Sequence, residues 1–177
     1  GIASTAMGTN TIAEGTSSTA MGYRTKAKAY ASTAMGRYNI GGGDSTTWVN
    51  TDPLFEIGNG TSSNSKNNAL TVLKNGNIGI GTASPHTSSI LDVSSNNKGL
   101  LLPRISIVNV SDTLPVSSPA TSLLVYNTNA GVVGGNGLGF YFWDGSSWES
   151  LKNSEQTLSL SGSTLNISGG NSVVLPG

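Results

Sequence analysis

The first 44 residues of the chain repeat one short motif at a fixed spacing. The letters STAMG begin at Ser4, Ser18 and Ser32, so the period is 14 residues. Repeats of this kind are typical of a solenoid, in which each coil buries its apolar side by stacking on the next coil. Gly, Ser and Thr at this density would make a weak helix, whereas a coil with a contour of roughly 46 Å has room for two short strands and two turns. We therefore predict a β-solenoid with a thin, alanine-filled interior.

Composition narrows the classes of partner. The 177 residues include 9 basic and 9 acidic side chains, and only 10% of the residues are charged, against about 25% in an average globular protein. Nucleic acid is therefore not an expected partner. No apolar run approaches the roughly 18 residues that span a bilayer, so no membrane insertion is expected. The chain has no Cys, which excludes disulfides and thiolate metal sites. Disorder is disfavoured because the apolar residues fall in alternating runs.

Residues 45–85 read as a neck followed by a β-hairpin. Asn75-Gly76 lies between two strand-like runs, and this dipeptide favours a two-residue type I′ turn. Such a turn predicts the pairs Leu73–Ile78, Val72–Gly79, Thr71–Ile80 and Leu70–Gly81. One face would then carry Leu73, Ile78 and Ile80, while Leu70 and Val72 would face glycines. Because an isolated hairpin is not stable, we expect Ile78 and Ile80 to pack in the core of a trimer.

Residues 86–153 read as a small β domain. Its strand candidates are SILDVSS, GLLLPRISIV, SLLVYNT and LGFYFWDGSSWESL, and Asp144-Gly145 marks a second hairpin. Trp143 and Trp148 flank that turn. They are interpreted either as the domain core or, together with Asp144, as a sugar-stacking platform that binds a receptor.

Residues 154–177 contain three short runs of alternating apolar and polar residues joined by glycine turns. Each strand would have one apolar face, and strands this short cannot close a core within one chain. Three copies around an axis could do so, which predicts a β stalk. The residues assigned to its trimer core are Leu158, Leu160, Leu165, Ile167, Val173 and Leu175.

Chemistry-bearing motifs are weak throughout. His86 is the only His, and a catalytic triad needs a positioned nucleophile and an orienting carboxylate as well. The glycine motifs NIGIGTASP and GGNGLGF do not precede a helix, so they do not predict a phosphate cradle. The sequence GGGD followed by Asp52 allows a Ca²⁺ site, but a turn at Asp44 is the more frequent meaning of such a sequence and is the favoured interpretation. We expect no enzymatic activity, cofactor or metal.

Two families resemble parts of the chain. The repeat xxASTAMGxxxxAx resembles the head repeats of trimeric autotransporter adhesins, which implies a left-handed parallel β-roll in each of three chains. Gly1 and Gly15 hold the second glycine of the repeat, but Ala29 replaces it in the third coil. The segments DPLFEIGNGTSSNSKNNALTVLKNGNIGIGTASP, LDVSSNNKGLLLPRIS and QTLSLSGSTLNISGG resemble tail fibres of phages and phage-like contractile injection systems. Both resemblances imply homotrimeric, extracellular proteins of attachment.

The sequence is therefore interpreted as an all-β homotrimeric fibre segment with four modules, at residues 1–44, 45–85, 86–153 and 154–177. The expected partners are two further copies, fibre or baseplate proteins, and a glycan or protein of the host cell surface. The expected location is a virion or injection-system tail. Because the chain begins inside a repeat, we also expect further repeats upstream. The alternatives are a trimeric bacterial surface adhesin, a fibre-borne glycan hydrolase or lyase, and an ice-binding solenoid built on the row Thr5, Thr19 and Thr33.

Overall fold

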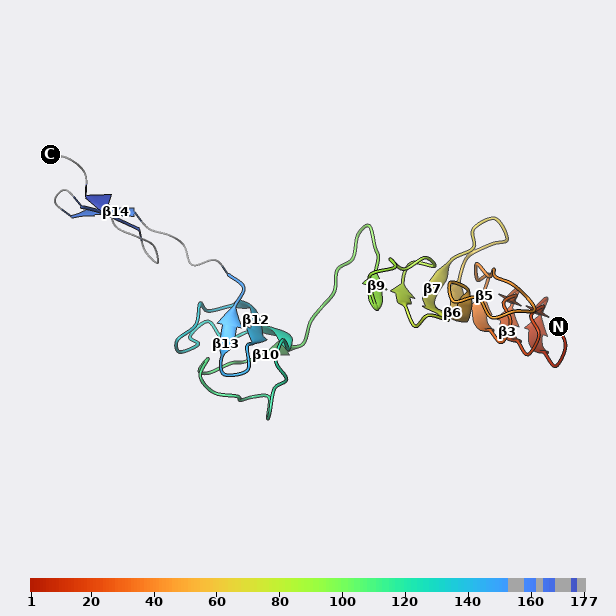
Figure 1. The fold of residues 1–177 in the computed structure, drawn as a ribbon, viewed down its shortest axis with the longest axis horizontal. Coiled ribbons are helices and arrows are strands. Elements are labelled where there is room, and N and C mark those ends of the chain that lie inside the picture. Colours follow the sequence, from red (N-terminus) through yellow and green to blue (C-terminus); the bar gives the residue numbers. More distant parts are fainter. Residues whose placement is uncertain (153–157, 162–163, 168–172, 175–177) are drawn as a thin grey trace. The chain divides into compact units, whose positions relative to one another are not determined.

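The computed structural model describes residues 1–152, 158–161, 164–167 and 173–174 (Figure 1). These residues form strands, turns and loops, with no helix among them. The all-β class predicted from the sequence is therefore confirmed. The chain divides into two compact units, residues 1–100 and residues 101–177, and each is described by itself.

The N-terminal repeats form a roll of stacked parallel coils, as their period predicted. Each coil contributes a five-residue strand, and the three strands pair so that each repeat residue lies beside its own copy 14 residues away. A second, shorter pair of parallel strands closes the other side of the roll. The strands are β1 (Thr5–Thr9), β2 (Ile12–Ala13), β3 (Thr19–Tyr23), β4 (Lys26–Ala27) and β5 (Thr33–Arg37).

Alanine fills the interior of the roll. Ala20, Ala27 and Ala34 form a buried cluster with Ala13 packed against it. Only a methyl group fits there, because strands β3 and β5 lie directly across a thin interior from β4. Side chains alternate across a strand, so the neighbours of Ala20 and Ala34, Met21 and Met35, point out of the roll.

The sheet of the roll continues through the next four strands without a break. Strand β6 (Pro53–Asn59) pairs in parallel with β5, β7 (Asn68–Leu73) is antiparallel to β6, β8 (Ile78–Ile80) is antiparallel to β7, and β9 (Leu91–Val93) is parallel to β8. The result is one seven-stranded sheet in the order β1-β3-β5-β6-β7-β8-β9. This sheet crosses the module boundaries predicted at residues 44–45 and 85–86, so the repeats and the hairpin belong to one packed unit.

The predicted β7–β8 hairpin forms, but its predicted register is wrong by one residue. Gly76 donates its N–H to the Leu73 carbonyl at 2.9 Å, Leu73 donates to the Asn77 carbonyl at 2.9 Å, and Val72 pairs with Ile78. Of the two predicted turn residues, only Gly76 has a positive φ, at 91°. A type I′ turn needs two such residues, whereas a three-residue loop ending in a glycine bulge needs one. Leu70, Val72, Ile78 and Ile80 consequently share one face, and Leu73 lies on the other.

A buried carboxylate ends the stack of alanines. Glu56 pairs with Ala34 across β5 and β6 and is 3% exposed. Its Oε2 accepts a hydrogen bond from Asn39 Nδ2 at 2.8 Å, and its Oε1 accepts from Asn68 Nδ2 at 2.6 Å and from the Gly41 N–H at 3.1 Å. Both amides are fixed in turn by backbone groups. Glu56 therefore joins the last coil to strands β6 and β7 through bonds that need a carboxylate.

We expect Glu56→Gln to destabilise each chain by about 2–3 kcal/mol. Both carboxylate oxygens accept from N–H donors, so an amide nitrogen at either position would face another donor and leave it unsatisfied in the interior. Urea unfolding measures the loss, and Glu149→Gln serves as the control because Glu149 is exposed. Equal midpoints for the two variants would contradict the assignment of Glu56 as a structural acceptor.

Residues 101–152 form a second sheet over a separate core. The strands run in the order β10-β11-β12-β13, with β10 and β11 parallel and the others antiparallel. They are β10 (Arg104–Ile105), β11 (Leu124–Asn127), β12 (Gly139–Trp143) and β13 (Trp148–Ser150). One face of this sheet covers the buried cluster of Ile107, Val125, Val132, Tyr141, Trp143 and Trp148. The prediction that the aromatic hairpin supplies the core of this domain is confirmed.

The C-terminal segment forms a three-stranded antiparallel meander of β14 (Leu158–Ser161), β15 (Thr164–Ile167) and β16 (Val173–Val174). The pairs include Leu158 with Ile167, Leu160 with Leu165, and Leu165 with Val173. The apolar positions of the three strands are thus brought opposite one another, and Leu158 and Leu160 are exposed. Leu175, which was also assigned to the stalk core, lies outside the described residues.

Candidate interaction surfaces

The largest candidate surface is the outer face of the seven-stranded sheet, here called the apolar face. The strand registers align two continuous rows of side chains across all seven strands. The first row is Met7, Met21, Met35, Ile57, Leu70, Ile80 and Val93. The second row is Thr5, Thr19, Thr33, Phe55, Val72, Ile78 and Leu91. The threonine row considered for ice binding is therefore short and leads into large apolar side chains.

Nothing within the first unit covers the apolar face. The exposed fraction is 59% for Met7, 44% for Ile80 and 50% for Leu91. The side chains of the two rows on the central strands are half-buried. None of the positions in the two rows carries a charge. A contiguous apolar strip of this length is unusual on a monomer and marks an interaction site. Ile78 and Ile80, predicted to contribute to a trimer core, both lie on it.

Sequence reasoning missed most of this face because the hairpin register was misassigned. The signal was nevertheless present as apolar residues two positions apart, at Phe55 and Ile57 and again at Leu91 and Val93. This is the same spacing that separates Thr and Met in each repeat. Because the side chains of paired strands lie in register on the same face, this spacing passes from one strand to the next, and the four later strands continue the surface of the roll.

The two tryptophans considered as a sugar-stacking platform are buried instead. Trp143 and Trp148 pair across β12 and β13 with ring centroids 5.4 Å apart, and they are 5% and 1% exposed. Burial of both rings in the core leaves neither tryptophan a surface on which a sugar could stack.

Asp144 closes the turn between the two tryptophans. Its Oδ1 accepts hydrogen bonds from the Ser146 N–H at 2.7 Å and the Ser147 N–H at 2.8 Å. These backbone donors stabilise the carboxylate and lower the pKa of Asp144. Asp44 holds the turn before Trp48 in the same way, with Thr46 and Thr47 as donors, and its pKa is lowered too. Both carboxylates thus stabilise turns. For Asp44, this is the alternative to a Ca²⁺ site that the GGGD sequence offered.

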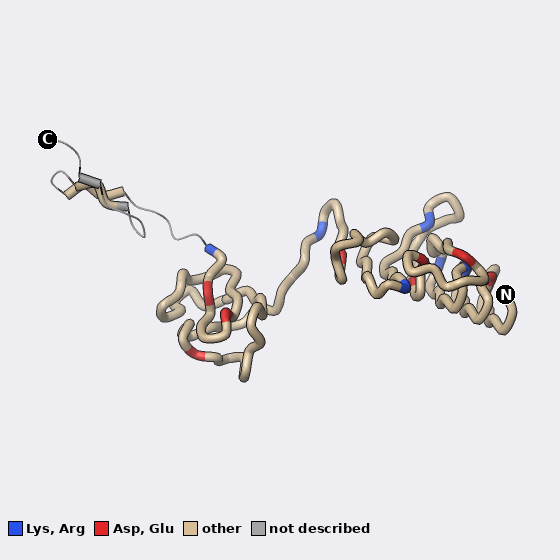
Figure 2. The backbone as a smooth tube through the Cα atoms, in the orientation of Figure 1, with Lys and Arg blue, Asp and Glu red and all other residues tan. Residues whose placement is uncertain are grey.

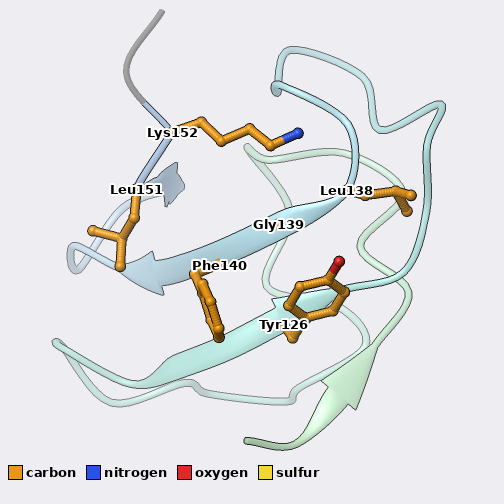
Figure 3. A pocket seen from close by; sticks show the side chains of 6 residues that line it. All are labelled: Tyr126, Leu138, Gly139, Phe140, Leu151 and Lys152. Atoms are coloured by element: carbon orange, nitrogen blue, oxygen red, sulfur yellow. The ribbon is translucent and has the colours of Figure 1, made fainter.

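One exposed and one half-buried aromatic side chain lie on the opposite face of the second sheet. Tyr126 and Phe140 project from the neighbouring strands β11 and β12, with ring centroids 5.3 Å apart in an edge-to-face arrangement (Figure 3). They line a groove of about 340 Å³ together with Leu138, Gly139, Leu151 and Lys152. Phe140 is 45% exposed. This apolar groove is the second candidate surface.

The residues considered for catalysis do not assemble a site. The His86 ring nitrogen Nδ1 lies 2.7 Å from Ser88 Oγ, but the Asp92 carboxylate accepts from the backbone N–H of His86 and so does not orient the ring. In the described part of the chain, no three His, Asp or Glu side chains gather closely enough to hold a metal ion. Figure 2 shows that the charged residues are sparse and scattered along the backbone.

Two known families match different parts of the chain. Residues 79–168, just over half of the chain, match the family described as phage tail like trimerisation region. Residues 1–25 and 13–39 match two copies of the YadA head domain repeat. No curated protein and no solved structure matches the chain. The described residues include no helix with the length and apolar character needed to cross a membrane.

Proposed function

Because the chain belongs to the phage tail-like trimerisation family, we propose that it is a homotrimeric fibre segment by which a phage tail or a phage-like contractile injection system attaches to host cells. The observation that carries the proposal is the apolar face, which extends over seven strands and has no cover within residues 1–100. Three copies around an axis cover such a face with every subunit equivalent.

The families matched by the chain favour an assembly and adhesion role over catalysis. In the proposed trimer the apolar face of each chain packs against its two partners, and the groove at Tyr126 and Phe140 supplies a second contact. Fibre or baseplate proteins hold one end of the segment, and a host-surface glycan or protein is the target. The working location is extracellular, on the tail.

The mass of the chain in solution tests the proposal. Sedimentation equilibrium is expected to give three times the 18.0 kDa of one chain, with no folded monomer on dilution. A stable, well-folded monomer would contradict the proposal, because it would show that the apolar face does not need to be covered by partner chains.

A trimeric adhesin on a bacterial surface is the second candidate, favoured by the two YadA head repeats. Antibodies raised against residues 1–100 distinguish the two by electron microscopy of the source organism. Label on tail-like particles supports the fibre, whereas label on the cell envelope supports the adhesin.

The proposed stalk gives a separate prediction. Leu160 pairs with Leu165 and is exposed in the single chain, and we propose that it faces the threefold axis. Leu160→Asp is expected to lower the melting temperature of the trimer by several degrees, because three carboxylates would meet at the axis. Ser159→Asp, on the alternate face, is the control and should have little effect. Equal shifts in melting temperature would contradict the axial assignment.

A further inference from the structure

A polar groove lies at one corner of the roll. Its volume is about 400 Å³, within the roughly 300–1,000 Å³ of small-molecule sites. The loop between β6 and β7 forms one wall and the corners of the coils form the other. The lining residues are Asn10, Ile12, Arg24, Thr25, Lys26, Tyr38, Ser63 and Lys66.

The groove opens away from the apolar face. Ala13 and Ala27 point into the roll and pack with the alanines of β3 and β5. Their strand neighbours Ile12 and Lys26 therefore point outward on the opposite side, and Ile12 is exposed. A ligand in the groove would remain accessible when the apolar face is covered by partner chains.

The corner holds its side chains in fixed positions. Asn10, Arg24 and Tyr38 occupy the same place in successive coils, with φ values of 55°, 52° and 44°. Asn tolerates this left-handed conformation, whereas Arg and Tyr are less suited to it. Backbone bonds from the Arg24 N–H to the Thr9 carbonyl and from the Tyr38 N–H to the Tyr23 carbonyl tie each corner to the preceding coil. All three corner side chains line the groove, including the two that are least suited to the turn.

Two of the three basic side chains in the groove lack an acidic partner among the described residues. Lys26 pairs with Glu14, but among the described residues neither Arg24 nor Lys66 has a carboxylate within 4.0 Å. The Arg24 guanidinium instead lies 6.0 Å from the centre of the Tyr38 ring. Arg24 and Lys66 are both exposed, so an anion in the groove can reach them.

Neighbouring aromatic and basic side chains order this cluster. Tyr23 packs edge-to-face against Tyr38 at 5.5 Å, and Arg37 lies 5.7 Å from the Tyr38 ring centre on its way to the carbonyls of Gly60 and Thr61. Arg37 thus connects the aromatic pair to the loop that carries Lys66. The Arg24 guanidinium favours the phenolate of Tyr23 by hydrogen bonding and lowers its pKa.

The geometry points to a binding site for an acidic saccharide, a sugar ring that bears a carboxylate. The guanidinium of Arg24 matches a carboxylate with paired hydrogen bonds, and Lys66 adds a second positive charge from across the groove. Tyr38 supplies an amphipathic ring wall for the sugar, and Asn10 and Ser63 supply polar groups for hydroxyls. The inference rests on the proposed attachment function, because it names the chemistry of the surface that the fibre would bind.

Binding of defined sugars to the oligomeric chain tests the inference. The probes are 3′-sialyllactose and digalacturonate as two acidic saccharides from different sources, and lactose as the neutral sugar, measured by isothermal titration calorimetry. We expect at least one acidic probe to bind and lactose not to bind. Arg24→Gln and Lys66→Gln should each weaken that binding about tenfold. Lys28→Gln removes the same charge from the roll outside the groove and should leave the affinity unchanged.

Three outcomes would overturn the inference. The first is equal binding of acidic and neutral probes or of neither, and the second is an affinity unaffected by Arg24→Gln and Lys66→Gln. The third is an equal loss in Lys28→Gln, which would show that the sugar responds only to net charge. The oligomeric mass and the melting temperature of each variant are measured alongside, because Arg24 and Lys66 are exposed and their loss should change neither. If the trimer forms but no acidic sugar binds, the groove inference fails and the fibre assignment stands.

Discussion

Replacing Gly22 with Val is expected to separate the coils of the roll and to destabilise it by about 3 kcal/mol or more. Gly22 has a φ of 118°, and a Cβ at this position would lie 2.1 Å from the Gly36 carbonyl oxygen of the next coil. Gly8 and Gly36 are blocked in the same way, by the carbonyl oxygens of Gly22 and Gly58. Each atom in conflict belongs to the backbone, so a rotamer change cannot relieve the clash.

Limited proteolysis and urea unfolding together measure this effect. Gly22→Val should expose residues 1–40 to cleavage at protease concentrations that leave the parent chain intact, and should shift the first unfolding transition to lower urea. Gly99→Val is the matched control, because a Cβ at Gly99 meets no atom within 4 Å. A roll that keeps its protease resistance with Val at position 22 would mean that the coils are not stacked at this glycine column.

The repeat predicted its part of the fold well for a physical reason. In a parallel stack the same residue of each coil must occupy the same place, so the period of 14 residues alone sets the pairs Ala20–Ala34 and Met21–Met35. The period does not by itself set the direction of the methionines, because a stacked row of Met could fill the coil or face a partner chain. The structure resolves this through the second strand of the coil, whose Ala27 leaves no space for a longer side chain.

The hairpin shows where local sequence is insufficient. Asn75-Gly76 is compatible with a two-residue turn and with a three-residue loop that ends at Gly76, and these loops differ by one residue in register. The choice is made by the sheet, since the observed register places Ile80 and Ile78 beside Leu70 and Val72. These two residues already lie beside Ile57 and Phe55 of β6. No pattern within residues 70–80 contains that information.

The candidate sites also separate into what the local sequence predicts and what only the packed fold decides. Burial of Trp143 and Trp148 was one of two interpretations of the aromatic hairpin, and only the packing of Ile107 and Val132 from distant loops decides between them. The groove at Arg24 was not predicted, because its walls come from successive coils and from Lys66 in a loop some 40 positions away. The buried acceptor role of Glu56 likewise depends on Asn39 and Asn68, which the fold alone brings together.

Ile57→Asp is expected to abolish the trimer. Ile57 lies at the centre of the apolar face, on β6, the fourth of seven strands, between Met35 and Leu70. In the proposed trimer each chain would lose about 2 kcal/mol of the stabilisation that apolar burial provides at this position. Each chain would also bring a carboxylate into a surface that offers it no partner. Threefold symmetry repeats both costs in every subunit, so their sum exceeds what a marginally stable assembly tolerates.

The matched control is Ile12→Asp, which makes the same change at an exposed isoleucine of the roll on the side away from the apolar face. Sedimentation equilibrium should show a trimer for Ile12→Asp and dissociated chains for Ile57→Asp. If Ile57→Asp does not fold, Ile57→Ala extends the test, because it removes apolar burial without adding a charge. At equal protein concentration, the Ile57→Ala trimer should melt at a lower temperature than the parent trimer. If Ile57→Asp and Ile12→Asp give the same mass and the same melting temperature, the apolar face is not the surface through which the chains associate. If only Ile57→Asp dissociates, the apolar face, to which the repeats and the hairpin both contribute, is the contact that assembles this part of the fibre.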